Sequence, residues 1–232
     1  MDKMSSNKLL IAFFIMMSLA IAISGCMSNP TSLSNTSVSS ADFSIITMEP
    51  IQPQSLDPAF CYGSGGLEII QNVYQTLLFY NGSSTSDLVG VLAKSYTMSP
   101  DGLNYTFYLR DNINFSDGTP FNASAVKYTF DRGVIMNQPS GSWSTDLTPF
   151  LAGGRAYMHS NQPSADISNY LAHDSVQVIN ETTIVFHLEK PYAAFPYALT
   201  WLAASIISPS YDQAHGGYKA NNQSTYMYNH MC

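Results

Sequence analysis

A sharp change of composition at Cys26 divides this chain of 232 residues into two parts of different physical character. Lys3 and Lys8 precede an uninterrupted apolar run, LLIAFFIMMSLAIAI, at 9–23. A positive end followed by an apolar core of this length is typical of a secretory signal. The run has no polar stripe, as an amphipathic core helix would, and it is shorter than the roughly 20 apolar residues of a membrane span. The sequence therefore predicts export.

The small residues before Cys26 resemble the lipobox of bacterial and archaeal lipoproteins, in which the cysteine carries a lipid and becomes the mature N-terminus. An ordinary cleavage site with an incidental cysteine is the alternative. The polar tract at 26–42 favours the lipobox, because it contains little that could form a core and is typical of a flexible tether. We therefore expect a lipoprotein signal peptide over 1–25, a lipid anchor to the cytoplasmic membrane on Cys26, a tether over 26–42, and a folded part at the cell surface over 43–232.

The charge of the chain excludes one class of partner. The net charge is −7 and the 9 Lys and Arg residues do not cluster, so we expect no nucleic-acid binding. Charged residues make up 11% of the chain, so Ser, Thr, Asn and Gln must supply much of the polar surface. N-x-[ST] sequons are compatible with a glycoprotein that faces outward, and they begin at Asn35, Asn81, Asn104, Asn114, Asn122, Asn180 and Asn222.

The sequence carries no recognisable catalytic or metal-binding motif. Besides Cys26 it contains Cys61 and Cys232, whose separation does not tell whether they pair, and no CxxC occurs. The 5 histidines lack ligand spacing, and GxSxG, HExxH and Walker motifs are absent. We therefore expect no metal, no cofactor and no enzymatic activity. A secreted hydrolase with catalytic residues far apart in the sequence, and a surface component without a small ligand, are the alternatives.

The first half of the folded part changes from helical to strand periodicity. A short β-rich run begins at Phe43, and apolar residues spaced by three and four predict an amphipathic helix over 67–80. Residues 88–98 and 103–110 are predicted to be strands, since apolar and polar residues alternate along 103–110. The sequence SPDG at 99–102 predicts the turn between them.

The second half returns to a helix and then to strands. Asn122 can cap a helix that follows it, because its side chain can accept a hydrogen bond from a free backbone N–H. Residues 137–166 are rich in Pro and Gly and are predicted to be loop. A second strand pair is predicted over 175–180 and 182–190.

Several stretches in this order resemble the extracellular solute-binding proteins of family 5, which serve ABC importers of oligopeptides, dipeptides and nickel. The most specific is 99–132, which joins SPDGLNYTFYLR to FSDGTPFNASAVKYTFDR. Ala125 departs from the family pattern, in which an acidic residue often precedes the valine. The other stretches are SLDP at 55–58, VYQTLLFY at 73–80, LAKSY at 92–96, TIVFHLEKPY at 183–192 and ASIISP at 204–209.

The resemblance implies the mixed α/β fold of the type II periplasmic binding proteins, in which two lobes close on a ligand. Residues 43–80 and about 196–232 would form the core of the first lobe, and about 81–195 a small domain inserted in it. In the family a glycine-rich segment and a second lobe follow, so we expect the second lobe to be missing from this chain.

The resemblance also implies a function and partners. The protein would capture peptides or a similar solute and deliver them to the transmembrane permease subunits of an ABC importer. Nickel chelates and oligosaccharides also occur as ligands in this family, and they stay open as alternatives.

Family members place the loop after the first strand at the ligand cleft, and in this chain it comprises Phe60, Cys61, Tyr62, Gly63, Ser64, Gly65 and Gly66. Its glycines let backbone N–H groups approach a ligand, and Tyr62 offers a ring and a hydroxyl. A plain turn into a helix is the alternative. Trp143, in a polar loop, and Trp201, in an apolar segment, are further candidate ligand contacts, with core packing as the alternative for Trp201.

Overall fold

The structure, a computed structural model, describes residues 53–136, 143, 147–154, 163–219, 224 and 226–231. These residues belong to one compact unit, Met48–Cys232. The predicted signal, Cys26, the tether, Cys232 and two sequons, Asn35 and Asn222, lie outside the described residues. Within the described ranges, no helix has the length and apolar character needed to cross a membrane.

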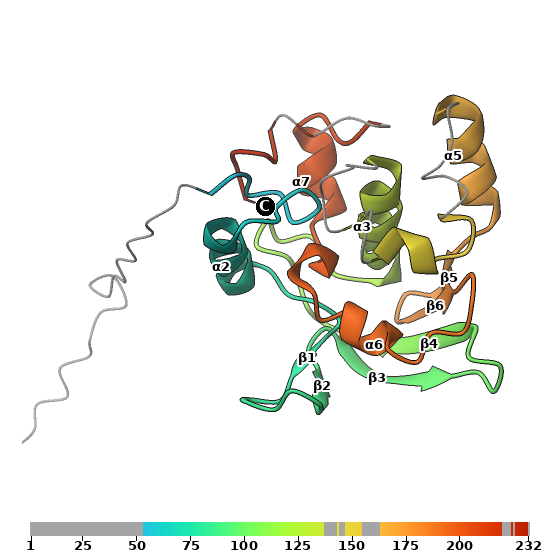
Figure 1. Cartoon of the computed structure of the whole chain (residues 1–232). Coiled ribbons are helices and arrows are strands. Elements are labelled where there is room, and N and C mark those ends of the chain that lie inside the picture. The colour runs from blue at the N-terminus through green and yellow to red at the C-terminus, as the bar shows by residue number, and fades with distance from the viewer. Residues whose placement is uncertain are drawn as a thin grey trace, which may run out of the picture. The chain divides into compact units, whose positions relative to one another are not determined.

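A four-stranded antiparallel sheet organises the fold (Figure 1). Its strands lie in the order β3 (Ala93–Met98), β4 (Asn104–Leu109), β6 (Thr183–His187) and β5 (Val176–Asn180). The predicted pair over 175–180 and 182–190 is therefore confirmed, the pair over 88–98 and 103–110 is confirmed for Ala93–Met98, and β6 pairs with β4 as well as with β5. Two hairpins far apart in the sequence form one sheet.

Alternation along the strands gives the sheet one buried face. Tyr105, Phe107 and Leu109 of β4 are buried, as the sequence predicts. Phe186 and Ile184 of β6 stand opposite Tyr105 and Phe107 and are buried as well. Adjacent large side chains on one face stabilise the sheet by cross-strand packing.

The predicted turn at 99–102 joins β3 and β4. Gly102 has φ of 69°, a conformation that residues with a side chain rarely adopt. Its N–H donates to the Ser99 carbonyl at 2.9 Å. The turn is confirmed, and it sets the register of the hairpin.

Helix α3 (Ala123–Met136) packs on β5 and β6 (Figure 1). Asn122 caps it as predicted, since its Oδ1 accepts from the Ala125 N–H at 3.1 Å. Phe130 lies edge-on against Phe186, with ring centroids 4.8 Å apart, and against Trp143 at 5.1 Å. These rings join the helix to the sheet in one core.

The helix predicted over 67–80 is shorter in the structure and gives way to a strand. Helix α2 spans Ser64–Val73, and the backbone is extended at Tyr74. Strand β1 (Leu78–Tyr80) then pairs antiparallel with β2 (Leu88–Gly90). The prediction was wrong beyond Val73 because helical spacing continues into residues that also favour strands, and here a partner strand decides.

The strand predicted over 88–98 is interrupted, so that β2 and β3 belong to different sheets. Val91 N–H donates to the Leu77 carbonyl at 3.0 Å, and Leu92 N–H to the Thr76 carbonyl at 3.3 Å. These bonds turn the chain from the β1–β2 hairpin into the larger sheet.

Residues 137–166, predicted to be loop, contain helical structure in their described part. The 3-10 helix η3 (Thr148–Phe150) has Pro149 in its first turn, and α5 (Pro163–Ala172) begins at Pro163. Proline fits the first turn of a helix because the N–H it lacks needs no partner there. Pro149 and Pro163, which suggested a loop, therefore mark helix starts.

The last described segments return to the region around α2. They contain α6 (Phe195–Ala198), η4 (Leu202–Ala204) and α7 (Pro209–Ala214). A small second core forms beneath α2, separate from the core of the sheet, from Cys61, Ile70, Tyr74 and Ile207.

Candidate functional site

The predicted ligand loop begins with a tightly bonded turn. The Asp57 carboxylate accepts from the Ala59 N–H at 3.0 Å. The Asp57 carbonyl accepts from the N–H groups of Phe60 and Cys61 at 3.0 and 2.8 Å. Three consecutive bonds to one residue fix the path of the chain up to Cys61, immediately before Tyr62.

Cys61 is a free thiol that is completely buried, and it packs against the start of α2. Its Sγ lies 3.8 Å from the Gly63 carbonyl oxygen. A Cβ on Gly66 would overlap Sγ and lie 2.9 Å from the Ser55 carbonyl oxygen, so only glycine fits there. Burial raises the pKa of the Cys61 thiol, and the contact with Gly63 offsets this only in part. Cys61 therefore supports the loop from behind.

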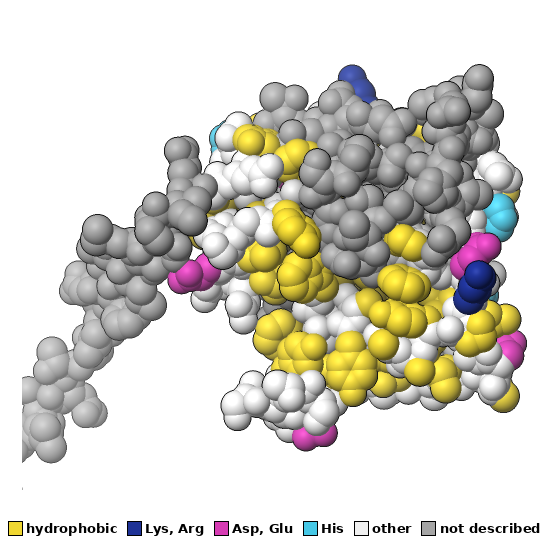
Figure 2. Space-filling model, viewed as in Figure 1, with side chains coloured by type: hydrophobic (Ala, Val, Ile, Leu, Met, Phe, Trp, Pro, Cys, Tyr) yellow, Lys and Arg dark blue, Asp and Glu magenta, His cyan; other side chains and the backbone are white. Residues whose placement is uncertain are grey.

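Tyr62, by contrast, is 56% exposed and lines a hollow of about 570 Å³, which we call the aromatic hollow. Figure 2 shows hydrophobic side chains gathered on this face of the molecule, over the β1–β2 hairpin and α6. The volume falls within the range of small-molecule sites. The residues that line the hollow are Tyr62, Phe79, Tyr80, Phe150, Tyr192, Tyr197, Ala198, Thr200, Trp201 and Leu202.

Several rings of the aromatic hollow are fixed by contacts with one another or with the backbone. Phe150 and Tyr192 stack in parallel, with centroids 4.1 Å apart. Tyr197 donates its hydroxyl to the Ser86 carbonyl at 2.7 Å and lies 6.5 Å from the ring of Tyr80. No ionisable carboxylate, amine or imidazole is among the lining residues. The surface can therefore bind an apolar or aromatic group and donate hydrogen bonds from phenols.

The structure brings together two of the predicted site residues, Tyr62 and Trp201, in this hollow. Trp201 is 37% exposed, so the alternative of core packing does not hold for it. Gly63 and Ser64 are exposed at the start of α2, and Gly65 is buried in its first turn.

Phe60 and Trp143 lie elsewhere. Phe60 is half-buried, with its ring 5.8 Å from that of Tyr228. Trp143 is 1% exposed, and its Nε1 donates to the Ala203 carbonyl at 3.0 Å. The indole of Trp143 is a core residue of this lobe, so we do not include it in the proposed site. An aromatic ring in a polar loop needs an apolar surface to pack on, and for Trp143 this surface is the core beside α3.

Sequence reasoning missed most of the wall of the aromatic hollow. Phe79 and Tyr80 were assigned to a helix, and Phe150 to a loop. Tyr192 precedes the short helix α6 and Tyr197 lies within it, and no periodicity reveals this helix. The density of aromatic residues was a usable signal, but the pairing that brings them together is visible only in three dimensions.

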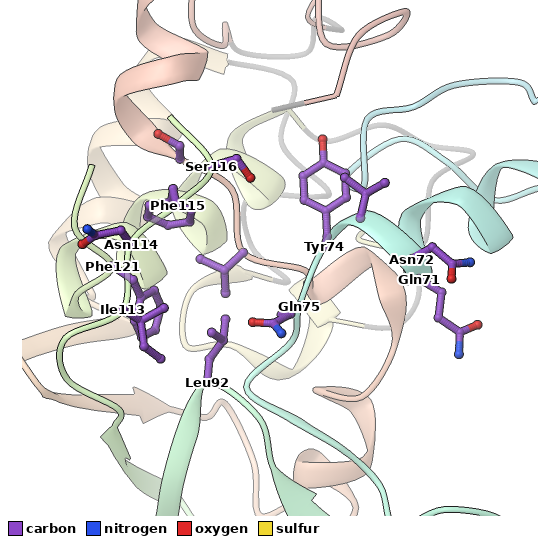
Figure 3. A pocket seen from close by; sticks show the side chains of 13 residues that line it. Gln71, Asn72, Tyr74, Gln75, Leu92, Ile113, Asn114, Phe115, Ser116 and Phe121 are labelled. Carbon is purple, nitrogen blue, oxygen red and sulfur yellow. The ribbon is translucent and has the colours of Figure 1, made fainter. Parts of the chain in front are cut away.

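A second hollow, of about 320 Å³, lies between the end of α2 and the loop that precedes α3. Figure 3 shows Gln75 and Leu92 directed into the space beside Ile113 and Phe115. The polar groups that line it are hydroxyls and amides, and the side chain of Asn114 is one of these amides. In the described part of the chain, no group of three His, Cys, Asp or Glu residues could hold a metal ion.

The comparisons with known proteins agree with this architecture. The family model for bacterial extracellular solute-binding proteins, family 5 Middle, matches residues 87–227. The probable D,D-dipeptide-binding periplasmic protein DdpA of Escherichia coli K12 is 31% identical over 179 residues, which cover 73% of this chain and 30% of DdpA. The glutathione-binding protein GsiB of Escherichia coli O1:K1 is 30% identical over 165 residues, covering 70% of this chain and 27% of GsiB.

Solved structures show the same fold. The substrate-binding domain of an oligopeptide ABC transporter from Bacillus anthracis str. Ames matches with a TM-score of 0.63 at 18% identity, over 73% of this chain and 31% of that one. A periplasmic oligopeptide-binding protein from Borrelia burgdorferi matches with a TM-score of 0.61 at 21% identity, over 71% and 31% of the two chains. The chain thus spans less than a third of the length of these relatives.

The fold is a mixed α/β part of the fold of the type II periplasmic binding proteins. The chain belongs to the bacterial extracellular solute-binding proteins of family 5, whose matched members are binding proteins of transporters.

Proposed function

We propose that this chain is part of a lipid-anchored, extracellular solute-binding protein that delivers peptides or similar solutes to the permease of an ABC importer. The observation that carries the proposal is the aromatic hollow, in which Tyr62 of the predicted ligand loop meets Trp201. Relatives named for binding a dipeptide and glutathione support the peptide class.

The chemistry of the hollow indicates which part of a solute it binds. Its lining is aromatic, with phenol hydroxyls and no charged side chain. Burying an anionic group against it would cost solvation energy that nothing there returns, because the faces of aromatic rings carry negative potential. This lobe therefore favours an uncharged, apolar or aromatic side chain of the solute, and it disfavours both a nickel chelate and an acidic peptide side chain. Phenols and rings also suit the apolar face of an oligosaccharide, which is the second candidate.

We assign residues 43–80 and about 196–232 to the core of the first lobe and about 81–195 to an inserted subdomain. The small core beneath α2 favours this division, since its buried residues Cys61, Ile70, Tyr74 and Ile207 all come from the first-lobe ranges, whereas the core of the sheet joins residues of both ranges. The lipid on Cys26 and the tether over 26–42 would hold the lobe at the membrane surface.

The test is binding without turnover. We expect the tripeptide Ala-Phe-Ala to raise the unfolding temperature of the protein in a saturable way, since ligand bound only to the native state stabilises it. Tyr62→Ala and Trp201→Ala should remove the shift, while Tyr108→Ala, at an exposed aromatic on the sheet, should keep it. Mass spectrometry should recover the peptide intact. Cleaved peptide would favour a hydrolase, and no shift with peptide or maltotriose would favour a surface component without a small ligand.

We also propose that glycosylation, where it occurs, is confined to part of the sequons. Asn81, Asn114 and Asn180 are exposed in the structure. Asn122 uses its Oδ1 to cap α3, and Asn104 Oδ1 lies 2.6 Å from Nδ1 of His187. Glycopeptide mapping should find sugar at the exposed positions and none at Asn122. Sugar is carried by Nδ2, which the cap leaves free, so sugar on Asn122 would contradict only the expectation that this half-buried side chain is inaccessible to the transferase.

A further inference from the structure

Behind the predicted ligand loop lies a cluster of buried charges. Arg132 of α3 is 1% exposed, and Asp57 and Asp212 are fully buried. The three residues come from segments far apart in the sequence: the start of the loop, the middle of the chain and α7. Buried charges of this kind require close partners, because each loses its hydration.

The guanidinium of Arg132 connects these segments directly. Nη1 and Nη2 donate to the two carboxylate oxygens of Asp57 at 2.9 and 2.7 Å. Nε donates to Oδ2 of Asp212 at 3.1 Å, and the same oxygen accepts from the Tyr128 hydroxyl at 2.7 Å. A two-pronged bond to a carboxylate fixes orientation as well as distance. Burial alone would lower the pKa of Arg132, but its bonds with Asp57 and the charge of Asp212 raise it, so the cation persists.

Asp57 passes this constraint on to the loop. Its Oδ1 accepts from Arg132 and also from the Ala59 N–H, and its own N–H donates to Oγ of Ser55 at 3.1 Å. The Asp57 carbonyl holds the N–H of Cys61, and Tyr62 is the next residue.

The loop also packs closely against α2. The Sγ of Cys61 and the Ser55 carbonyl occupy the space that a side chain on Gly66 would need. The turn is therefore held both by the guanidinium and by its contact with the helix, while Tyr62 stays exposed at its end.

We propose that Arg132 is a positioning residue: through Asp57 it sets the conformation of the loop that presents Tyr62 to the solute. Arg132 does not line the aromatic hollow and acts only through the loop. The inference depends on the proposed function for its consequence on binding, but the constraint on the loop can be measured without any ligand.

The buried thiol of Cys61 reports on the loop. In a background in which Cys26 and Cys232 are replaced by serine, Cys61 is the only thiol, and its labelling by a disulfide reagent requires the turn to open. Asp57→Asn keeps an oxygen for the Ala59 N–H but removes the charge, and Arg132→Lys keeps the charge but cannot bridge both carboxylates.

Lys127→Met is the matched control for this experiment. Lys127 also lies on α3 and pairs with Asp131 and Asp174 at 3.2 and 2.9 Å, which are both outside the loop. Labelling rates are compared after correction for global stability, measured by urea unfolding of each variant.

We expect Asp57→Asn and Arg132→Lys to accelerate Cys61 labelling at least about tenfold beyond the change in global stability, and Lys127→Met to show no such excess. The two loop variants should also weaken binding of Ala-Phe-Ala, while the control should not. Labelling that follows global stability equally in all variants would overturn the proposal. Faster labelling without any peptide binding, even in the parent protein, would overturn the proposed function and leave the positioning role intact.

Hydrogen exchange on the unaltered chain gives the same test if the variants fail to fold. The Cys61 amide should open with the same free energy as amides in the middle of α3, because the guanidinium joins them in one cooperative unit. A Cys61 amide that exchanges at least about tenfold faster than those of α3 would show that the loop opens independently, and the proposal would be wrong.

Discussion

Gly133→Ala should destabilise this protein, although the same change stabilises most helices. Alanine is favoured over glycine by about 1 kcal/mol inside a helix. Here the new Cβ would lie 2.6 Å from Cζ2 of Trp143 and closer still to Cε2 and Cδ2. The indole cannot retreat, since it is 1% exposed and its Nε1 is bonded to the Ala203 carbonyl at 3.0 Å.

The magnitude follows from these two opposing effects. Overpacking a rigid core costs about 1–3 kcal/mol, and the anchored ring places this site at the upper end. Subtracting the helix preference of about 1 kcal/mol leaves a net loss of about 2 kcal/mol in the free energy of unfolding. Urea unfolding followed by circular dichroism measures this loss directly.

A double-mutant cycle separates the clash from other effects of the substitution. In a Trp143→Phe background the smaller ring leaves room, so Gly133→Ala should stabilise the protein by the helix preference of about 1 kcal/mol, and the coupling should be about 3 kcal/mol. A Gly133→Ala variant as stable as the parent, or more stable, would refute the packing of Trp143 on α3.

Three further outcomes are expected. Phe186→Ala should lower the free energy of unfolding by about 3–5 kcal/mol, because Phe186 is fully buried between the sheet and α3. Tyr108→Ala, on the exposed face of the sheet, should lower it by less than about 1 kcal/mol. Equal losses in urea unfolding would contradict the assignment of the two faces. Gly102→Ala should cost about 1–2 kcal/mol by the same assay, since φ is 69°, and no loss would show that the turn differs. Burial raises the pKa of Tyr170 well above its usual value, so the unfolded chain loses this proton near pH 10 while the native state keeps it. The free energy of unfolding should therefore fall as pH rises above about 10. In Tyr170→Phe this fall should be shallower, and an unchanged pH profile would contradict burial of the phenol.

The sequence predicted the sheet well because its signals there are local. The alternation along 103–110 and the glycine at 102 act over a few residues, and the structure confirms both. The cap at Asn122 is a signal of the same kind. The predicted boundaries of helices and strands were wrong where tertiary contacts decide the structure. Leu78–Tyr80, for example, forms a strand only because β2 lies beside it.

Two residues of the candidate site could be predicted from the sequence, but most of the residues that line its walls could not. Tyr62 was proposed because the family resemblance places its loop at the cleft, and Trp201 from its residue type, and both line the aromatic hollow. Phe150 and Tyr192 stack on each other from segments that no sequence pattern connects. The bond between Asp57 and Arg132 escaped notice for the same reason, since buried ion pairs leave no periodic trace.

The account rests on the aromatic hollow as the surface that receives solute, and Trp201 can report on it directly. The chain has 2 Trp residues, of which Trp143 is buried and Trp201 is 37% exposed, so acrylamide quenches mainly Trp201. We predict that Ala-Phe-Ala protects Trp201 from quenching in a saturable way, that Ala-Asp-Ala does so far less, and that Tyr62→Ala abolishes the protection. Quenching that is unchanged by every peptide, or protection that survives in Tyr62→Ala, would contradict the central claim.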